Sequence, residues 1–193
     1  MNYSIEMTKN GCYNEIEITK ELEAVFMKKL ATLILAALLI ASLATAALAV
    51  PKDVEYDSTR SFLEVLDDRK IEYDYNGVDD DGDEGVYIAF PDEESGIAVR
   101  AFFDANGADC SLLAWNVIDY DEADFADIVE LCNQLNADYR WVRFYADTSD
   151  DSVTVAADAS FTKSSAGMIS AEMMDHIVSV VGKAWPELSK FRK

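Results

Sequence analysis

The sequence is short of the residue types from which most functional sites are built. Its 193 residues include one histidine, three cysteines, three prolines and eight glycines. A lone histidine, His176, and the absence of any C-x-x-C pair argue against a zinc or haem site. No G-x-G-x-x-G, Walker A or G-x-S-x-G pattern occurs, so neither a phosphate-binding loop nor a nucleophile elbow is present. We therefore expect no cofactor and no catalytic residues.

Positive charge is also scarce. Sixteen lysines and arginines stand against 37 aspartates and glutamates, which gives a formal net charge of −21. Contact with nucleic-acid phosphates needs clustered lysine and arginine, so we expect no nucleic-acid partner. Half of the residues are hydrophobic, which is enough for a core and excludes a disordered acidic tail. A chain of this length predicts one domain.

The longest uncharged run follows Lys28-Lys29 and extends to Val50. A basic start, an apolar stretch and the closing Ala47-Leu48-Ala49 are typical of a secretory signal peptide. We predict that residues 27–49 are this signal and that the mature protein is periplasmic or extracellular. The alternative is an uncleaved segment, residues 30–49, that anchors the protein in the membrane, because the run is long enough to span it.

Residues 1–26 precede the predicted signal peptide, which normally begins at the initiator. We interpret them as an extension upstream of the true start at Met27; a short amphipathic helix over residues 13–26 is the alternative. Residues 50–193 form the predicted domain, with 12 basic and 32 acidic residues and a net charge of −20. A single core of this size needs no metal or disulfide.

Hydrophobic periodicity predicts an α+β domain. Apolar residues recur every three or four positions in three segments and every second position in six others. The predicted helices run from Asp57 or Ser58 to about Lys70, from Asp121 or Asp124 to Asn136, and from Ser170 to Trp185-Pro186. The predicted strands cover residues 71–75, 86–90, 97–103, 111–118, 139–146 and 152–161. The short connections favour an antiparallel sheet of about six strands with helices packed on one face, in the order α-β-β-β-β-α-β-β-α.

Several predicted strands are apolar on both sides. In the fourth strand Leu113, Trp115 and Val117 alternate with Leu112, Ala114 and Ile118. If helices cover one face, an apolar patch remains on the other, and such patches commonly bind proteins. Its predicted members are Phe102, Leu112, Trp141 and Tyr145. Alternatively, the last helix wraps round the sheet and buries them.

Two further features leave alternatives open. Cys110 and Cys132 form either a disulfide, if the second helix stacks on the fourth strand, or two buried free thiols, which we favour. The loop from Gly77 to Gly85 is rich in aspartate, and Asp79, Asp81 and Asp83 suggest a calcium site. Its spacing departs from the calcium-loop template and its flanks are strands, so a solvated acidic turn is the other interpretation.

The stretch from Leu131 to Phe144 carries Asn133 and Asn136 at the end of a helix, followed by an aromatic strand. With the acidic hairpin at 147–155, Ser170-Ala171-Glu172 and the closing Trp185-Pro186-Glu187-Leu188, it resembles the YbjN-like family. The resemblance covers residues 58–188. That family is described as bacterial sensory transduction regulators and is similar in fold to type III secretion chaperones, which are small, acidic and dimeric.

The resemblance implies a noncatalytic module that binds a protein partner or a second copy of itself. Because the family is mostly cytoplasmic and this chain carries an export signal, we do not expect it to chaperone a secreted effector. We therefore expect an exported binding or regulatory module that self-associates through a sheet face. The alternatives are an acidic, calcium-responsive envelope protein and an enzyme of unrecognised type.

Overall fold

The order of helices and strands agrees with the prediction. The computed structural model describes residues 50–91 and 93–193, and the predicted signal peptide and upstream extension lie outside these residues. The elements are α2 (Asp57–Arg69), β1 (Asp74–Val78), β2 (Glu84–Ala89), β3 (Ala98–Phe103), β4 (Asp109–Asp119), η1 (Glu122–Asp124), α3 (Phe125–Asp138), β5 (Arg143–Asp147), β6 (Ser152–Ser160), α4 (Ala166–Leu188) and η2 (Ser189–Phe191). The α+β class is confirmed.

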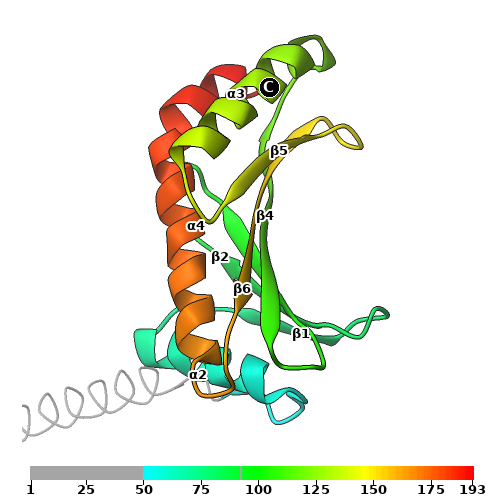
Figure 1. The fold of residues 1–193 in the computed structure, drawn as a ribbon, viewed down its shortest axis with the longest axis vertical. Coiled ribbons are helices and arrows are strands. Elements are labelled where there is room, and N and C mark those ends of the chain that lie inside the picture. The colour runs from blue at the N-terminus through cyan, green and yellow to red at the C-terminus, as the bar shows by residue number, and fades with distance from the viewer. Residues whose placement is uncertain (1–49, 92) are drawn as a thin grey trace, which may run out of the picture. The chain divides into compact units, whose positions relative to one another are not determined.

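The six strands form one antiparallel sheet in the order β1-β2-β3-β4-β6-β5. Strands β1 to β4 follow one another as neighbours, since short turns join them. The chain then leaves the sheet as α3 and returns as β5 and β6, so that β6 pairs with β4 (Figure 1). Strands β1 and β5 are consequently the two edges.

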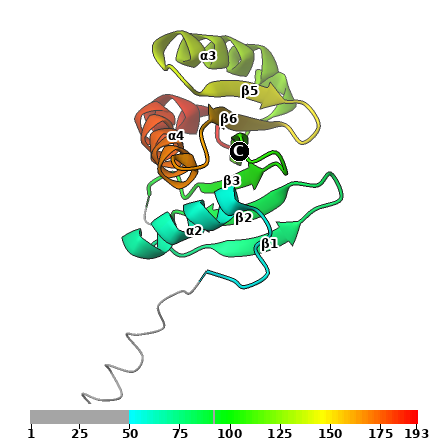
Figure 2. The same ribbon diagram turned by 60° about the horizontal axis from the view of Figure 1, so that its bottom comes forward.

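The three α-helices of residues 50–193 lie on one side of this sheet, which we call the inner face. Helix α4 packs along β4 and β6 and against α2, and α3 packs on β5. Figure 2 shows α2 beside the β1–β2 end of the sheet and α3 beside β5. The core is built from the inward side chains of the strands and the apolar sides of the helices, among them Phe62, Leu66, Ile88, Phe103, Leu112, Ile118, Ile128, Phe144, Met174 and Ile177.

The start of α2 depends on a residue far away in sequence. Tyr56 precedes the helix and no side-chain cap is formed, so the predicted caps, Asp57 and Ser58, are wrong. Instead the fully buried Glu84 of β2 accepts hydrogen bonds from the backbone N–H groups of Glu55 and Tyr56, at 2.6 and 3.0 Å. Its carboxylate also accepts one from the Tyr75 hydroxyl at 2.5 Å. Burial, and next the bond to Glu84, raises the pKa of Tyr75.

The ends of the other helices also differ from the prediction. Asn136 lies inside α3, which continues to Asp138, and does not take the left-handed conformation. Helix α4 begins at Ala166, before Ser170, and runs through Pro186 to Leu188. Trp185, just before the proline, and Leu188, two residues after it, are buried. Packing of these side chains holds the last turn on the core although proline lacks the N–H group of a helical residue.

Cys110 and Cys132 are buried free thiols. The Cys110 sulfur lies 3.2 Å from the Ser170 hydroxyl, which joins β4 to α4. Burial raises the pKa of Cys110 to about 12, although Ser170 lowers it, and raises that of Cys132 to about 11. Both thiols are protonated at neutral pH and therefore act as small core residues.

Candidate functional site

The outer face of the sheet carries none of the helices in the described part of the chain (Figure 1). On β3, the buried Val99, Ala101 and Phe103 point inward, so Arg100 and Phe102 point outward. Cross-strand pairing places Tyr87 of β2 next to Arg100. This face is where a binding site can form without displacing a helix.

Aromatic side chains and one arginine meet at the centre of the outer face. The Arg100 guanidinium carbon lies 4.8 Å from the Trp115 ring centroid and 5.6 Å from that of Tyr87. The rings of Phe102 and Trp115 are tilted, with centroids 5.7 Å apart. Cation–π and aromatic contacts of this kind hold the side chains in a defined arrangement. We call Tyr87, Arg100, Phe102 and Trp115 the outer aromatic cluster.

A bulge in β4 extends the apolar surface towards β5. The pairing of β4 with β6 is interrupted between Ala114 and Ile118, and Asn116 has a φ of 51°, a conformation that asparagine tolerates. Residues 115–117 consequently lie opposite Thr154, whose other neighbour is Tyr145. Thr154 is fully buried between them.

The four predicted binding residues occupy three different environments. Phe102 and Tyr145 lie on the outer face, as expected. Leu112 is 0% exposed in the core, so its predicted place on the surface is wrong; its neighbour Leu113, which is half-buried, points outward instead. Trp141 is 74% exposed but lies in a bend before β5, outside the strand predicted for it.

Three members of the cluster, Tyr87, Arg100 and Trp115, were not predicted as binding residues. The alternation had grouped Trp115 with Leu113 correctly, but it does not say which of two apolar faces the helices cover. Val117, which the alternation places with Leu113 and Trp115, is buried within the bulge, where the pairing of β4 with β6 is interrupted. A period of two persists only where a strand is regular.

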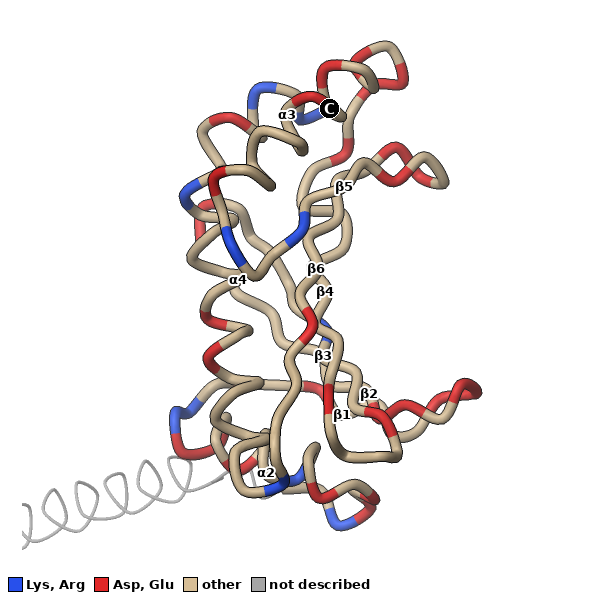
Figure 3. Tube along the Cα trace, in the orientation of Figure 1, with Lys and Arg blue, Asp and Glu red and all other residues tan. Residues whose placement is uncertain are grey.

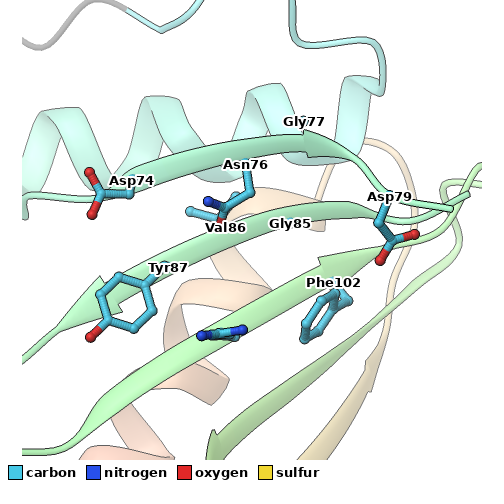
Figure 4. Close-up of a pocket in the computed structure, with 9 residues that line it drawn as sticks. Asp74, Asn76, Gly77, Asp79, Gly85, Val86, Tyr87 and Phe102 are labelled. Atoms are coloured by element: carbon cyan, nitrogen blue, oxygen red, sulfur yellow. The ribbon is translucent and has the colours of Figure 1, made fainter. Parts of the chain in front are cut away.

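A groove extends from the cluster to the β1 edge of the sheet, and three cluster members, Tyr87, Arg100 and Phe102, line it. It has a volume of about 430 Å³, and Asp74, Asn76, Asp79, Tyr87 and Phe102 surround it (Figure 4). Gly85 and Arg100 also line the groove. The groove thus combines two carboxylates with the aromatic rings of the outer face.

The loop between β1 and β2 is acidic (Figure 3). Hydrogen bonds within the loop stabilise it. The Asp79 carboxylate accepts hydrogen bonds from the backbone N–H groups of Asp81 and Asp83, each at 3.0 Å. Across residues 50–91 and 93–193, no three His, Cys, Asp or Glu side chains are grouped to hold a metal ion. Burial, and then the carboxylates of Asp79, Asp104 and Asp81, raises the pKa of Asp83.

At the opposite edge of the sheet, the side chain of Asn136 forms hydrogen bonds with the backbone of β5. The Asn136 amide accepts a hydrogen bond from the Phe144 N–H at 2.7 Å and donates one to the Phe144 carbonyl at 2.8 Å. Phe144 belongs to the edge strand β5, and Asn136 occupies the position that a neighbouring strand would take there. This contact explains the second asparagine of the N-x-x-N pair and protects the edge from pairing with other strands.

We expect Asn136→Ala to lower the free energy of unfolding by about 1–3 kcal/mol, because two backbone groups of β5 lose their partner. Asn133→Ala is the matched control, since Asn133 is exposed on the same helix, and we expect a change within about 0.5 kcal/mol. Urea denaturation of both variants measures the difference. Equal losses would show that the contact with Phe144 is not the stabilising feature.

A comparison with known protein families agrees with the resemblance in the sequence. The model of the YbjN family, described as "Putative bacterial sensory transduction regulator", matches residues 61–184. A similar solved structure is that of YbjN, "a putative transcription regulator from E. coli", with 14% sequence identity and a TM-score of 0.46. The match covers 67% of this chain and 92% of the other. No curated protein matches.

Proposed function

The chain belongs to the YbjN family of bacterial sensory transduction regulators, and from this premise we propose that it is an exported, noncatalytic regulator. It acts by binding proteins and self-associates through the outer face of its sheet. The observation that carries the proposal is the outer aromatic cluster. Trp115 and, beyond the bulge, Tyr145 are 40% and 41% exposed on a face that none of the described helices covers. Tryptophan, tyrosine and arginine are the residue types that contribute most to the energy of protein interfaces.

The chemistry of the described residues supports a noncatalytic role. The His176 ring donates a hydrogen bond from Nε2 to the Arg140 carbonyl at 2.8 Å, so it joins α4 to the bend before β5. The two cysteine thiols are protonated and buried. The family itself is described as one of regulators and not of enzymes.

Export is supported by the pattern of residues 27–49. Within residues 50–91 and 93–193, no helix combines the length and apolar character that a membrane crossing requires. We expect expression of the full chain in a bacterium to give a mature protein that begins at Val50, as N-terminal sequencing would show. An intact chain that sediments with membranes would instead support the anchor over residues 30–49.

Self-association is tested with residues 50–193, since the described residues from Val50 to Lys193 belong to one compact unit. We expect a dimer in sedimentation equilibrium, and we expect Trp115→Ala and Tyr145→Ala each to weaken it by tenfold or more, about the effect of losing an interface hot spot. Met168→Ala, which removes an exposed apolar side chain from α4, is the control and should leave the dimer intact. A monomer at every concentration would refute the self-association.

A further inference from the structure

We propose that the groove beside β1 binds a lysine- or arginine-rich segment of another protein. This site shares Tyr87, Arg100 and Phe102 with the outer aromatic cluster, but it extends away from Trp115 and Tyr145 onto β1 and the loop that follows β1. It does not depend on the protein being a dimer.

The shape of the groove suits side chains of a segment that lies along β1. Figure 4 shows Asp74 at the Tyr87 end, Asp79 at the Phe102 end and Asn76 between them. Gly85 has no side chain, which leaves room above the middle of β2. The two aromatic rings offer apolar surface for the methylene groups of lysine or arginine, and the carboxylates offer partners for the charged ends.

The negative charge around the groove favours a basic partner. The domain carries a net charge of −20, and the loop that contributes Asp79 also contributes Asp80, Asp81 and Asp83. Burial is the first cause of the raised pKa of Asp83, and repulsion from neighbouring carboxylates, Asp79 and Asp81 among them, is the second. No ion pair neutralises Asp74 within the part of the chain that the structure describes. A basic segment is therefore attracted to this end of the sheet, and an acidic one is repelled.

Among the described residues, Arg100 is the one basic residue that lines the groove, and it does not cancel the negative charge there. Its guanidinium lies over the Tyr87 and Trp115 rings, closer to Trp115, which does not line the groove. This contact demonstrates that the rings of the outer face accept a cation. A second cation from the partner binds next to it, at the carboxylates of β1 and the following loop.

The edge position of β1 adds a backbone surface. In the described residues β1 pairs with β2 alone, and its register shifts between Tyr75 and Gly77. A segment beside β1 can form only short runs of strand pairing across such an irregular edge. Side-chain contacts in the groove consequently provide most of the selectivity.

Isothermal titration of residues 50–193 with a blocked peptide of four Lys-Thr repeats tests the proposal, with a peptide of four Glu-Thr repeats as its counterpart. We expect the lysine peptide to bind and the glutamate peptide not to bind. Asp74→Asn should weaken binding about fivefold, the effect of losing one ion pair in a partly enclosed site. Glu64→Gln removes the same charge from an exposed position on α2 and should change the affinity less than about twofold.

Three outcomes decide the matter. Shifts of the Gly77 and Gly85 amide resonances on titration, together with the loss in Asp74→Asn, would support the groove. Absence of binding, or equal weakening by Asp74→Asn and Glu64→Gln, would overturn it, because the latter shows attraction to the overall charge alone. The Tyr145→Ala variant separates this proposal from self-association, since we expect it to bind the lysine peptide like the unaltered domain even where the dimer is lost.

Discussion

Gly167→Ala is expected to lower the free energy of unfolding by about 3 kcal/mol or more, because no space exists for a side chain there. Gly167 lies in the first turn of α4, where that helix meets α2. A Cβ atom at this position would be 2.2 Å from the Ser61 carbonyl oxygen and 2.5 Å from its carbonyl carbon. These are backbone atoms of another helix, so relief of the overlap requires the two helices to separate.

Gly182→Ala is the matched control in the same helix. Its added Cβ would meet no atom within 4 Å, and alanine favours the helical conformation over glycine by about 0.5–1 kcal/mol. We therefore expect opposite signs for the two substitutions when thermal or urea unfolding of residues 50–193 is measured. A small or stabilising effect of Gly167→Ala would show that α2 and α4 are not in contact at this point.

Glu84→Gln is expected to lower the free energy of unfolding by about 2–4 kcal/mol, since a buried group that accepts three hydrogen bonds loses half of its acceptors. One carboxylate oxygen accepts bonds from the Glu55 N–H and the Tyr75 hydroxyl, and the other accepts one from the Tyr56 N–H. In either orientation, the glutamine NH₂ group would face a backbone N–H. The start of α2 then loses the group that substitutes for a local cap.

Glu72→Gln makes the same chemical change at an exposed position just before β1, and we expect an effect within about 0.5 kcal/mol. Tyr75→Phe removes one donor and leaves both backbone bonds, so it should cost about 1 kcal/mol. Circular dichroism during urea titration measures all three variants. If Glu84→Gln were as mild as Glu72→Gln, the carboxylate would not be what holds the start of α2.

The site was only partly predictable, and the fourth strand illustrates why. Leu112 and Leu113 are equally apolar, so either could face the helices. Alternation separates the two sets of side chains, but it is a property of one strand and says nothing of what lies against each face. The helices cover the side of the sheet on which Leu112 lies, so Trp115 is exposed on the other side, beside Arg100. Phe102 and Tyr145 were placed correctly, and each shares its side of the strand with an exposed arginine, Arg100 on β3 and Arg143 on β5.

The sequence by itself determined the order of the elements, the α+β class and the membership of the YbjN family, because periodicity and short motifs are local properties of the chain. Only the tertiary structure decided which face the helices cover and which residues meet across it. Glu84 at the start of α2 and Gly167 against Ser61 join segments far apart in the sequence, and Asn136 of α3 bonds the edge strand β5 across the turn between them. Such contacts depend on how the elements pack, and no local pattern encodes them.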